Sequence, residues 1–194
     1  MQIIFFGAND AVLGRYDQHV SLSQYKENLK AIVEHPTTTA QDPKILILTP
    51  PPINEYQLRF FDAAKGFQTP SRTAENTKLY ADAAREVAAS LNLPVADIWT
   101  AFMKEVGWEE GQTLAGSKEI PENHRLASLL SDGIYFRCST SSYHLLRSTL
   151  GLHCTGEGNK VLYHEIMRAI RTAWPDEVPE EIRMNFPSWE TAPK

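Results

Sequence analysis

Cysteine is scarce in this chain of 194 residues, and its scarcity excludes a disulfide framework. The 2 cysteines, Cys138 and Cys154, could form one bridge or remain free thiols. We expect free thiols, because nothing in the sequence points to the oxidising compartments in which disulfides persist. Neither a cofactor nor a metal site is expected, since the histidines show no spacing typical of metal ligands.

Positive charge is outweighed by negative charge: 19 Lys and Arg residues stand against 24 Asp and Glu residues, for a net charge of −5 and a pI near 5.7. Nucleic acid is not an expected partner, because its binding needs a basic patch. The apolar runs are much shorter than a membrane span, which needs about 20 residues. The first residues lack the basic flank of a signal peptide, so a cytoplasmic location is the expectation. The sequence does not indicate which oligomeric state the protein adopts.

Strands are predicted to alternate with helices along the chain. Short apolar runs predict strands at residues 2–6, 44–49 and 93–98. Apolar side chains spaced by three and four predict helices at residues 21–33, 73–91, 99–106 and 156–174. The Thr and Pro runs at 37–39 and 50–52 are interpreted as linkers. This alternation is typical of a parallel α/β sheet in one domain.

A small polar loop follows the first predicted strand directly. It reads Gly7-Ala8-Asn9-Asp10, and open α/β sheets place ligand groups at the carboxyl ends of their strands. Gly7 lets the backbone approach a substrate closely, and the Asn9 amide can donate a hydrogen bond to a developing oxyanion. Asn9 and Asp10 could also form an ordinary turn, which these residue types favour.

The loop resembles the Gly-x-Asn-Asp block of the SGNH, or GDSL, family of serine esterases and lipases. Within that family the chain is most similar to the isoamyl acetate-hydrolysing esterase branch. The shared features are Gly-Ala-Asn-Asp-Ala at 7–11, an apolar strand ending in Pro-Pro-Pro at 45–52, and Arg-Thr-Ala-Glu-Asn at 72–76. The resemblance implies a flavodoxin-like three-layer α/β fold and the hydrolysis of short acyl esters such as acetate esters.

The resemblance also implies roles for three residues. Asn9 matches the family's oxyanion-hole Asn, and His153, in Gly-Leu-His-Cys-Thr-Gly-Glu-Gly, matches the His that serves as general base and acid. Asp132 matches the residue that orients this His. Taken alone, His153 could be a helix-start histidine and Asp132-Gly133 a turn.

Two features depart from the family pattern. The Gly-Asp-Ser block that supplies the nucleophile occurs nowhere in the sequence, and Asp132 and His153 are separated by 21 positions instead of three. Deleting residues 134–151 would restore Asp-Gly-Leu-His, so we expect this segment to be an insert, consistent with a translated intron. We therefore expect residues 1–174 to be an SGNH hydrolase domain that lacks its first strands, and residues 175–194 to be a tail.

The expected function is that of an SGNH-type esterase acting on a small ester, with this chain inactive because it lacks the nucleophile. Two alternatives stay open. The chain could be a non-catalytic product that binds a partner through an exposed sheet edge. A partner chain could also supply the serine.

Overall fold

A parallel sheet forms the centre of the computed structural model, which describes residues 1–131, 153–178 and 181. Strands β1 (Gln2–Phe5), β2 (Ile45–Leu48) and β3 (Val95–Ala96) pair in the order β1-β2-β3, all parallel. All four residues of β2 are buried, as expected of a strand covered on both faces. The parallel α/β class predicted from the sequence is confirmed.

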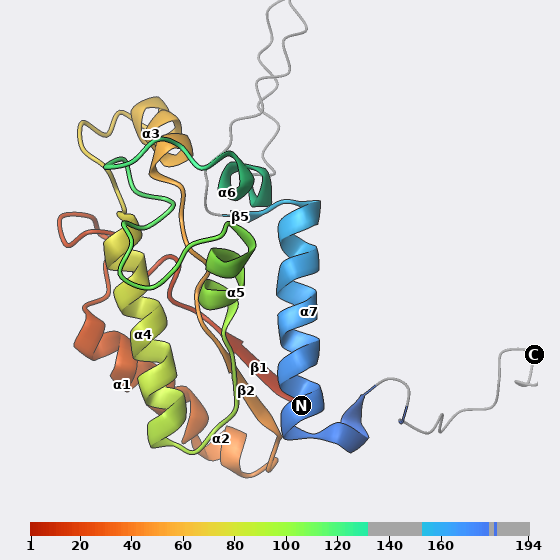
Figure 1. The fold of residues 1–194 in the computed structure, drawn as a ribbon. Coiled ribbons are helices and arrows are strands. Elements are labelled where there is room, and N and C mark those ends of the chain that lie inside the picture. The colour runs from red at the N-terminus through yellow and green to blue at the C-terminus, as the bar shows by residue number, and fades with distance from the viewer. Residues whose placement is uncertain (132–152, 179–180, 182–194) are drawn as a thin grey trace, which may run out of the picture.

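Seven α-helices accompany the strands in the described part of the chain (Figure 1). They are α1 (Leu22–Val33), α2 (Pro36–Thr39), α3 (Glu55–Ala64), α4 (Ala74–Ser90), α5 (Ile98–Glu105), α6 (His124–Leu129) and α7 (Gly156–Ala173), followed by the 3-10 turn η1 (Pro175–Glu177). A two-stranded antiparallel sheet joins β4 (Leu130–Ser131) to β5 (His153–Cys154). Within the described ranges, no helix is long and apolar enough to cross a membrane.

Three short helices were not predicted from the sequence. The Thr run interpreted as a linker forms α2, where Pro36 occupies the first turn and the His35 ring accepts from Thr37 N–H. In α3 the Asn54 side chain accepts from the N–H groups of Tyr56 and Gln57, and Asn123 caps α6. These helices have strong caps but too few turns for an apolar period to stand out.

The two faces of the sheet are covered by different helices (Figure 1). Ile4, Ile45 and Ile47 pack with the buried stripes of α1 and α4. Leu46 and Leu48 point the other way and pack with α5, α6 and α7. Because successive strand residues face opposite sides, this alternation yields the three-layer arrangement expected of a flavodoxin-like fold.

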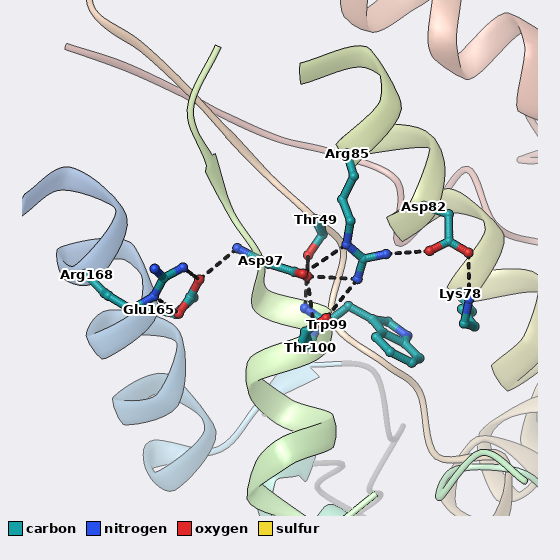
Figure 2. Close-up of polar contacts among 9 residues, drawn as sticks. All are labelled: Thr49, Lys78, Asp82, Arg85, Asp97, Trp99, Thr100, Glu165 and Arg168. Carbon is teal, nitrogen blue, oxygen red and sulfur yellow. Dashed lines mark hydrogen bonds and ion pairs between the residues drawn. The ribbon is translucent and has the colours of Figure 1, made fainter. Parts of the chain in front are cut away.

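One carboxylate joins four elements where β3 ends. Asp97 accepts two hydrogen bonds from Arg85 of α4 at 2.9 Å, one from the Thr49 hydroxyl after β2, and one from Thr100 N–H of α5 (Figure 2). The Asp97 N–H donates to Glu165 of α7. Burial raises the pKa of Asp97, but the hydrogen bonds and charge of Arg85 outweigh it and leave that pKa below its usual value.

The start of α7 lies against the end of α6. The Thr155 N–H donates to Leu129 O, and its hydroxyl donates to Ser128 O. A Cβ at Gly158 would lie 2.1 Å from Leu129 O, so only glycine fits this approach. The contact fixes β5, and His153 with it, relative to the rest of the domain.

Strand β1 lies at the edge of the described sheet. Ile3, Phe5 and Phe6 are 47%, 42% and 56% exposed. Ile3 and Phe5 pair in register with Leu46 and Leu48, yet the helices that bury those leucines leave them open to solvent. An apolar strand edge of this kind is a template for pairing with another chain.

Replacing Asp97 by Asn should lower the free energy of unfolding by about 1–3 kcal/mol at neutral pH, because Arg85 loses one of its two carboxylate partners in a partly buried site and keeps only Asp82. The pKa of Asp97 is depressed in the folded state, so its contribution is full above the unfolded value of about 3.9 and disappears as pH falls through the folded value. Urea unfolding at several pH values should show the two chains converging below about pH 4. In the matched control, Glu157→Gln breaks an exposed ion pair and should leave the midpoint unchanged; an equal loss there would contradict this account.

Gly158→Ala should lower the free energy of unfolding by about 1–3 kcal/mol, since the methyl group meets a backbone carbonyl that cannot move aside. Gly156→Ala is the control: it lies in the same turn of α7 and its Cβ would meet nothing within 4 Å. Thermal or urea unfolding compares the two variants. Equal stability of the two variants would show that α6 and α7 are farther apart at Gly158 than in the structure.

The exposed β1 edge should make the 194-residue chain self-associate and recover poorly after purification. Placing Lys at positions 3 and 5 should raise the monomer fraction in light scattering, because charge on an edge strand blocks further pairing. Leu79→Lys, on α4 and 49% exposed, tests whether any added charge has this effect. Cooperative thermal unfolding of the unsubstituted chain as a monomer would refute the expected self-association.

Candidate active site

A tight turn follows β1 at its carboxyl end. The Gly7 N–H donates to the Asp10 carboxylate at 3.1 Å, and Ala11 N–H donates to Gly7 O at 3.0 Å. Gly7 has a φ of +114°, a conformation that favours glycine. Asn9, two residues further on, is exposed in this turn.

Gly7 has a packing reason to lack a side chain. A Cβ there would lie 2.8 Å from Tyr25 Oη and 3.1 Å from Pro50 Cγ. The Tyr25 hydroxyl donates to Phe6 O, and burial followed by the charge of Asp10 raises the pKa of Tyr25. Tyr25 thus stays a neutral donor that supports the turn from α1. A substrate-binding role for Gly7 remains a prediction.

Arg72 fixes the orientation of the Asn9 amide. Its Nε donates to Ala8 O at 2.9 Å, and its Nη2 donates to Asn9 Oδ1 at 3.2 Å. With Oδ1 engaged, the Nδ2 group of Asn9 has no hydrogen-bond partner within the described part of the chain. Asn9 therefore presents a pre-oriented donor, which is what oxyanion stabilisation requires.

The Arg72 guanidinium is itself held in a buried position. Arg72 is 5% exposed, and burial lowers its pKa while the nearby Asp62 carboxylate acts in the opposite direction. Asp62 is positioned by the Ser71 N–H at 2.7 Å. Since arginine keeps its charge in proteins, the clamp on Asn9 is cationic.

The start of α4 carries the rest of this support. Thr73 caps the helix by accepting from Asn76 N–H, and the Asn76 side chain donates to Ala11 O at 2.7 Å. The buried Glu55 carboxylate of α3 accepts from Ala74 N–H. The segment at residues 72–76 thus holds the loop after β1. In the sequence it served only as a feature shared with the esterase family.

A cavity of about 340 Å³ opens between this loop and the start of α7. Gly7, Asn9 and His153 all line it. Its other walls are mostly apolar: Phe5, Phe6, Ala8, Asp10, Pro51, Cys154, Asn159 and Leu162. Residues 144 positions apart in the chain, Asn9 and His153, thus face one space.

His153 is exposed on β5, where it pairs with Ser131 of β4. Asp132 and the segment 134–151 lie outside the described residues, so the orienting role of Asp132 stays a prediction. The neighbouring Cys154 is a free thiol, and burial raises its pKa to about 11. A thiol with that pKa is almost fully protonated at neutral pH and is a poor nucleophile.

These groups suit acyl-transfer chemistry in part. An amide donor and an imidazole border a largely apolar cavity, as oxyanion stabilisation and general-base catalysis need. Sequence reasoning missed Arg72 and Tyr25, which position the donor. Arg72 lies in the quoted Arg-Thr-Ala-Glu-Asn segment, but that segment does not indicate its contact with Asn9, which depends on the folded geometry.

Comparison with known proteins also points to acyl-transfer enzymes. A model of the GDSL-like lipase/acylhydrolase family matches residues 2–161. A GDSL esterase/lipase of Arabidopsis thaliana is 31% identical over 191 residues, covering 95% of this chain and 64% of the relative. An isoamyl acetate-hydrolyzing esterase 1 homolog of Rattus norvegicus is 31% identical over 136 residues, covering 68% of this chain and 47% of the relative.

The fold is similar to that of solved structures as well. The crystal structure of a lipase/acylhydrolase from Enterococcus faecalis matches with a TM-score of 0.53 at 23% identity, covering 88% of this chain and 60% of that one. This chain therefore spans less than two thirds of the length of these relatives. The match across the sheet, the Asn9 loop and the first turns of α7 shows that the chain belongs to the GDSL-like lipase/acylhydrolase family.

Proposed function

We propose that this chain is part of a carboxylic ester hydrolase that cleaves short acyl esters such as acetate esters. The observation that carries the proposal is the shared cavity of Asn9 and His153. Its volume of about 340 Å³ and its apolar walls suit a small ester. The rat relative is named for the hydrolysis of isoamyl acetate, which supports the acetate class.

The proposed reaction passes through an acyl-serine intermediate. A serine hydroxyl attacks the ester carbonyl and transfers its proton to His153, which then protonates the leaving alcohol. The negatively charged carbonyl oxygen accepts a hydrogen bond from Asn9 Nδ2, and Arg72 holds this amide in place through Asn9 Oδ1. Water activated by His153 then releases the acid and regenerates the serine. Asp132 orients the imidazole in this scheme.

This chain alone should not turn over esters, because its sequence contains no Gly-Asp-Ser block to supply the attacking serine. The test begins with the genomic sequence upstream of the Met1 codon. If an in-frame Gly-Asp-Ser lies there, the extended protein should hydrolyse p-nitrophenyl acetate and the 194-residue chain should not.

In the extended protein, Asn9→Ala should lower kcat by about 100-fold or more, as loss of one oxyanion donor does elsewhere. His153→Ala should abolish turnover. Asn28→Ala and His164→Ala are matched controls on exposed faces of α1 and α7 and should keep full activity. If the 194-residue chain hydrolyses the ester and His153→Ala abolishes this turnover, the prediction that the chain is inactive is wrong. If the extended enzyme keeps full activity in both the Asn9 and the His153 variants, the proposed site is wrong.

A second candidate function follows from the β1 edge. Ile3 and Phe5 are exposed on an edge strand, so a partner could add a strand there without any catalysis. Ile3→Lys separates the two functions, since it would remove such a partner in a pull-down, and Ile3, unlike Phe5, does not line the cavity of Asn9 and His153.

A further inference from the structure

A second cavity is lined in part by Arg72, the residue that also contacts the Asn9 amide. It has a volume of about 300 Å³ and is formed by the chain that follows the Asn9 loop and by the end of α3 with the segment after it. Its lining residues are Val12, Arg15, Tyr16, Asp17, Gln18, Phe61, Lys65, Phe67, Ser71 and Arg72. We call it the cation-lined cavity; none of the residues of the ester pocket borders it.

Positive charge gathers in this cavity although the chain carries a net charge of −5. Arg15, Lys65 and Arg72 line it, against Asp17 as the one lining carboxylate. None of the three cations forms an ion pair within 4.0 Å with a carboxylate among the described residues. Arg15 donates to Pro70 O through Nη2, which leaves its other N–H groups for a ligand.

A buried hydroxyl in the same wall also lacks a partner. Ser71 is 3% exposed, and its Oγ has no hydrogen bond in the described structure. A buried polar atom without a partner costs free energy, so such atoms are rare and call for an explanation. The Oγ is closed off from solvent in the ligand-free structure, so it donates to an acceptor group bound in the cavity only after the Ser71 side chain rotates toward that group. Asp62, which the Ser71 N–H contacts, does not line the cavity.

The remaining walls are aromatic. The Tyr16 and Phe67 rings pack with centroids 4.7 Å apart, and Lys65 Nζ lies 4.0 Å from the centroid of Phe61. Arg15 likewise lies over the Tyr16 ring. Aromatic walls favour a flat apolar body over a small inorganic ion, and cations without a carboxylate partner favour a carboxylate.

We propose that the cation-lined cavity binds a small aromatic carboxylate. Arg15, Lys65 and the Ser71 hydroxyl hold the carboxylate, and the ring packs against Tyr16 and Phe67. The site is separate from the ester pocket, and its test has no activity readout, so it stands or falls apart from the proposed esterase function.

The test is a fluorine NMR titration of the 194-residue chain with 4-fluorobenzoate. We expect saturable binding, about tenfold tighter than that of the neutral 4-fluorobenzamide. Ser71→Ala should weaken 4-fluorobenzoate binding several-fold without lowering stability, because the hydroxyl has no partner to lose in the ligand-free fold. Lys65→Gln should weaken it about tenfold.

Arg59→Gln is the matched control, because Arg59 is exposed on α3 and lies over the Phe60 ring but does not line the cavity. It should leave the affinity unchanged. Equal binding of the benzamide, absence of saturation, or equal effects of Lys65→Gln and Arg59→Gln would overturn the proposal. Competition by inorganic phosphate at the same concentration as 4-fluorobenzoate would also overturn it, since charge alone would then account for binding.

Discussion

The Asp97 carboxylate is the constraint on which the arrangement of this domain depends. A three-stranded parallel sheet with a two-residue β3 offers few ladder hydrogen bonds of its own. Asp97 replaces them with contacts to α4, α5 and the end of β2, while its N–H reaches α7. Trp99 follows in the same turn and lies beside the Arg85 guanidinium, so the charged cluster is continuous with the core (Figure 2). The helices on both faces of the sheet are thereby fixed to one point.

The candidate site depends on the buried side chain of Arg72. A flexible asparagine after a strand has no preferred amide orientation, and catalysis would require it to be ordered anew in each cycle. The buried guanidinium removes that freedom by binding Ala8 O and Asn9 Oδ1 together. Pre-orientation of this kind is the main way in which proteins make a hydrogen-bond donor effective toward developing charge.

Much of this architecture could be predicted from the sequence. The long helix at residues 73–91 was predicted from the three- and four-residue spacing of its apolar side chains, and it corresponds to α4. Helix α3 was missed because its stability comes from the Asn54 cap and from contacts distant in sequence, as between Gln57 and Leu130 O. Such contacts leave no periodic pattern. The proximity of Asn9 and His153 followed from family resemblance, whereas Arg72's role needed the folded geometry.

The position of Arg72 has a consequence for both cavities. The residue lines the cation-lined cavity, and its guanidinium binds the side-chain oxygen of Asn9, which borders the other cavity. A substitution at position 72 would therefore alter the wall of one cavity and release the amide donor of the other.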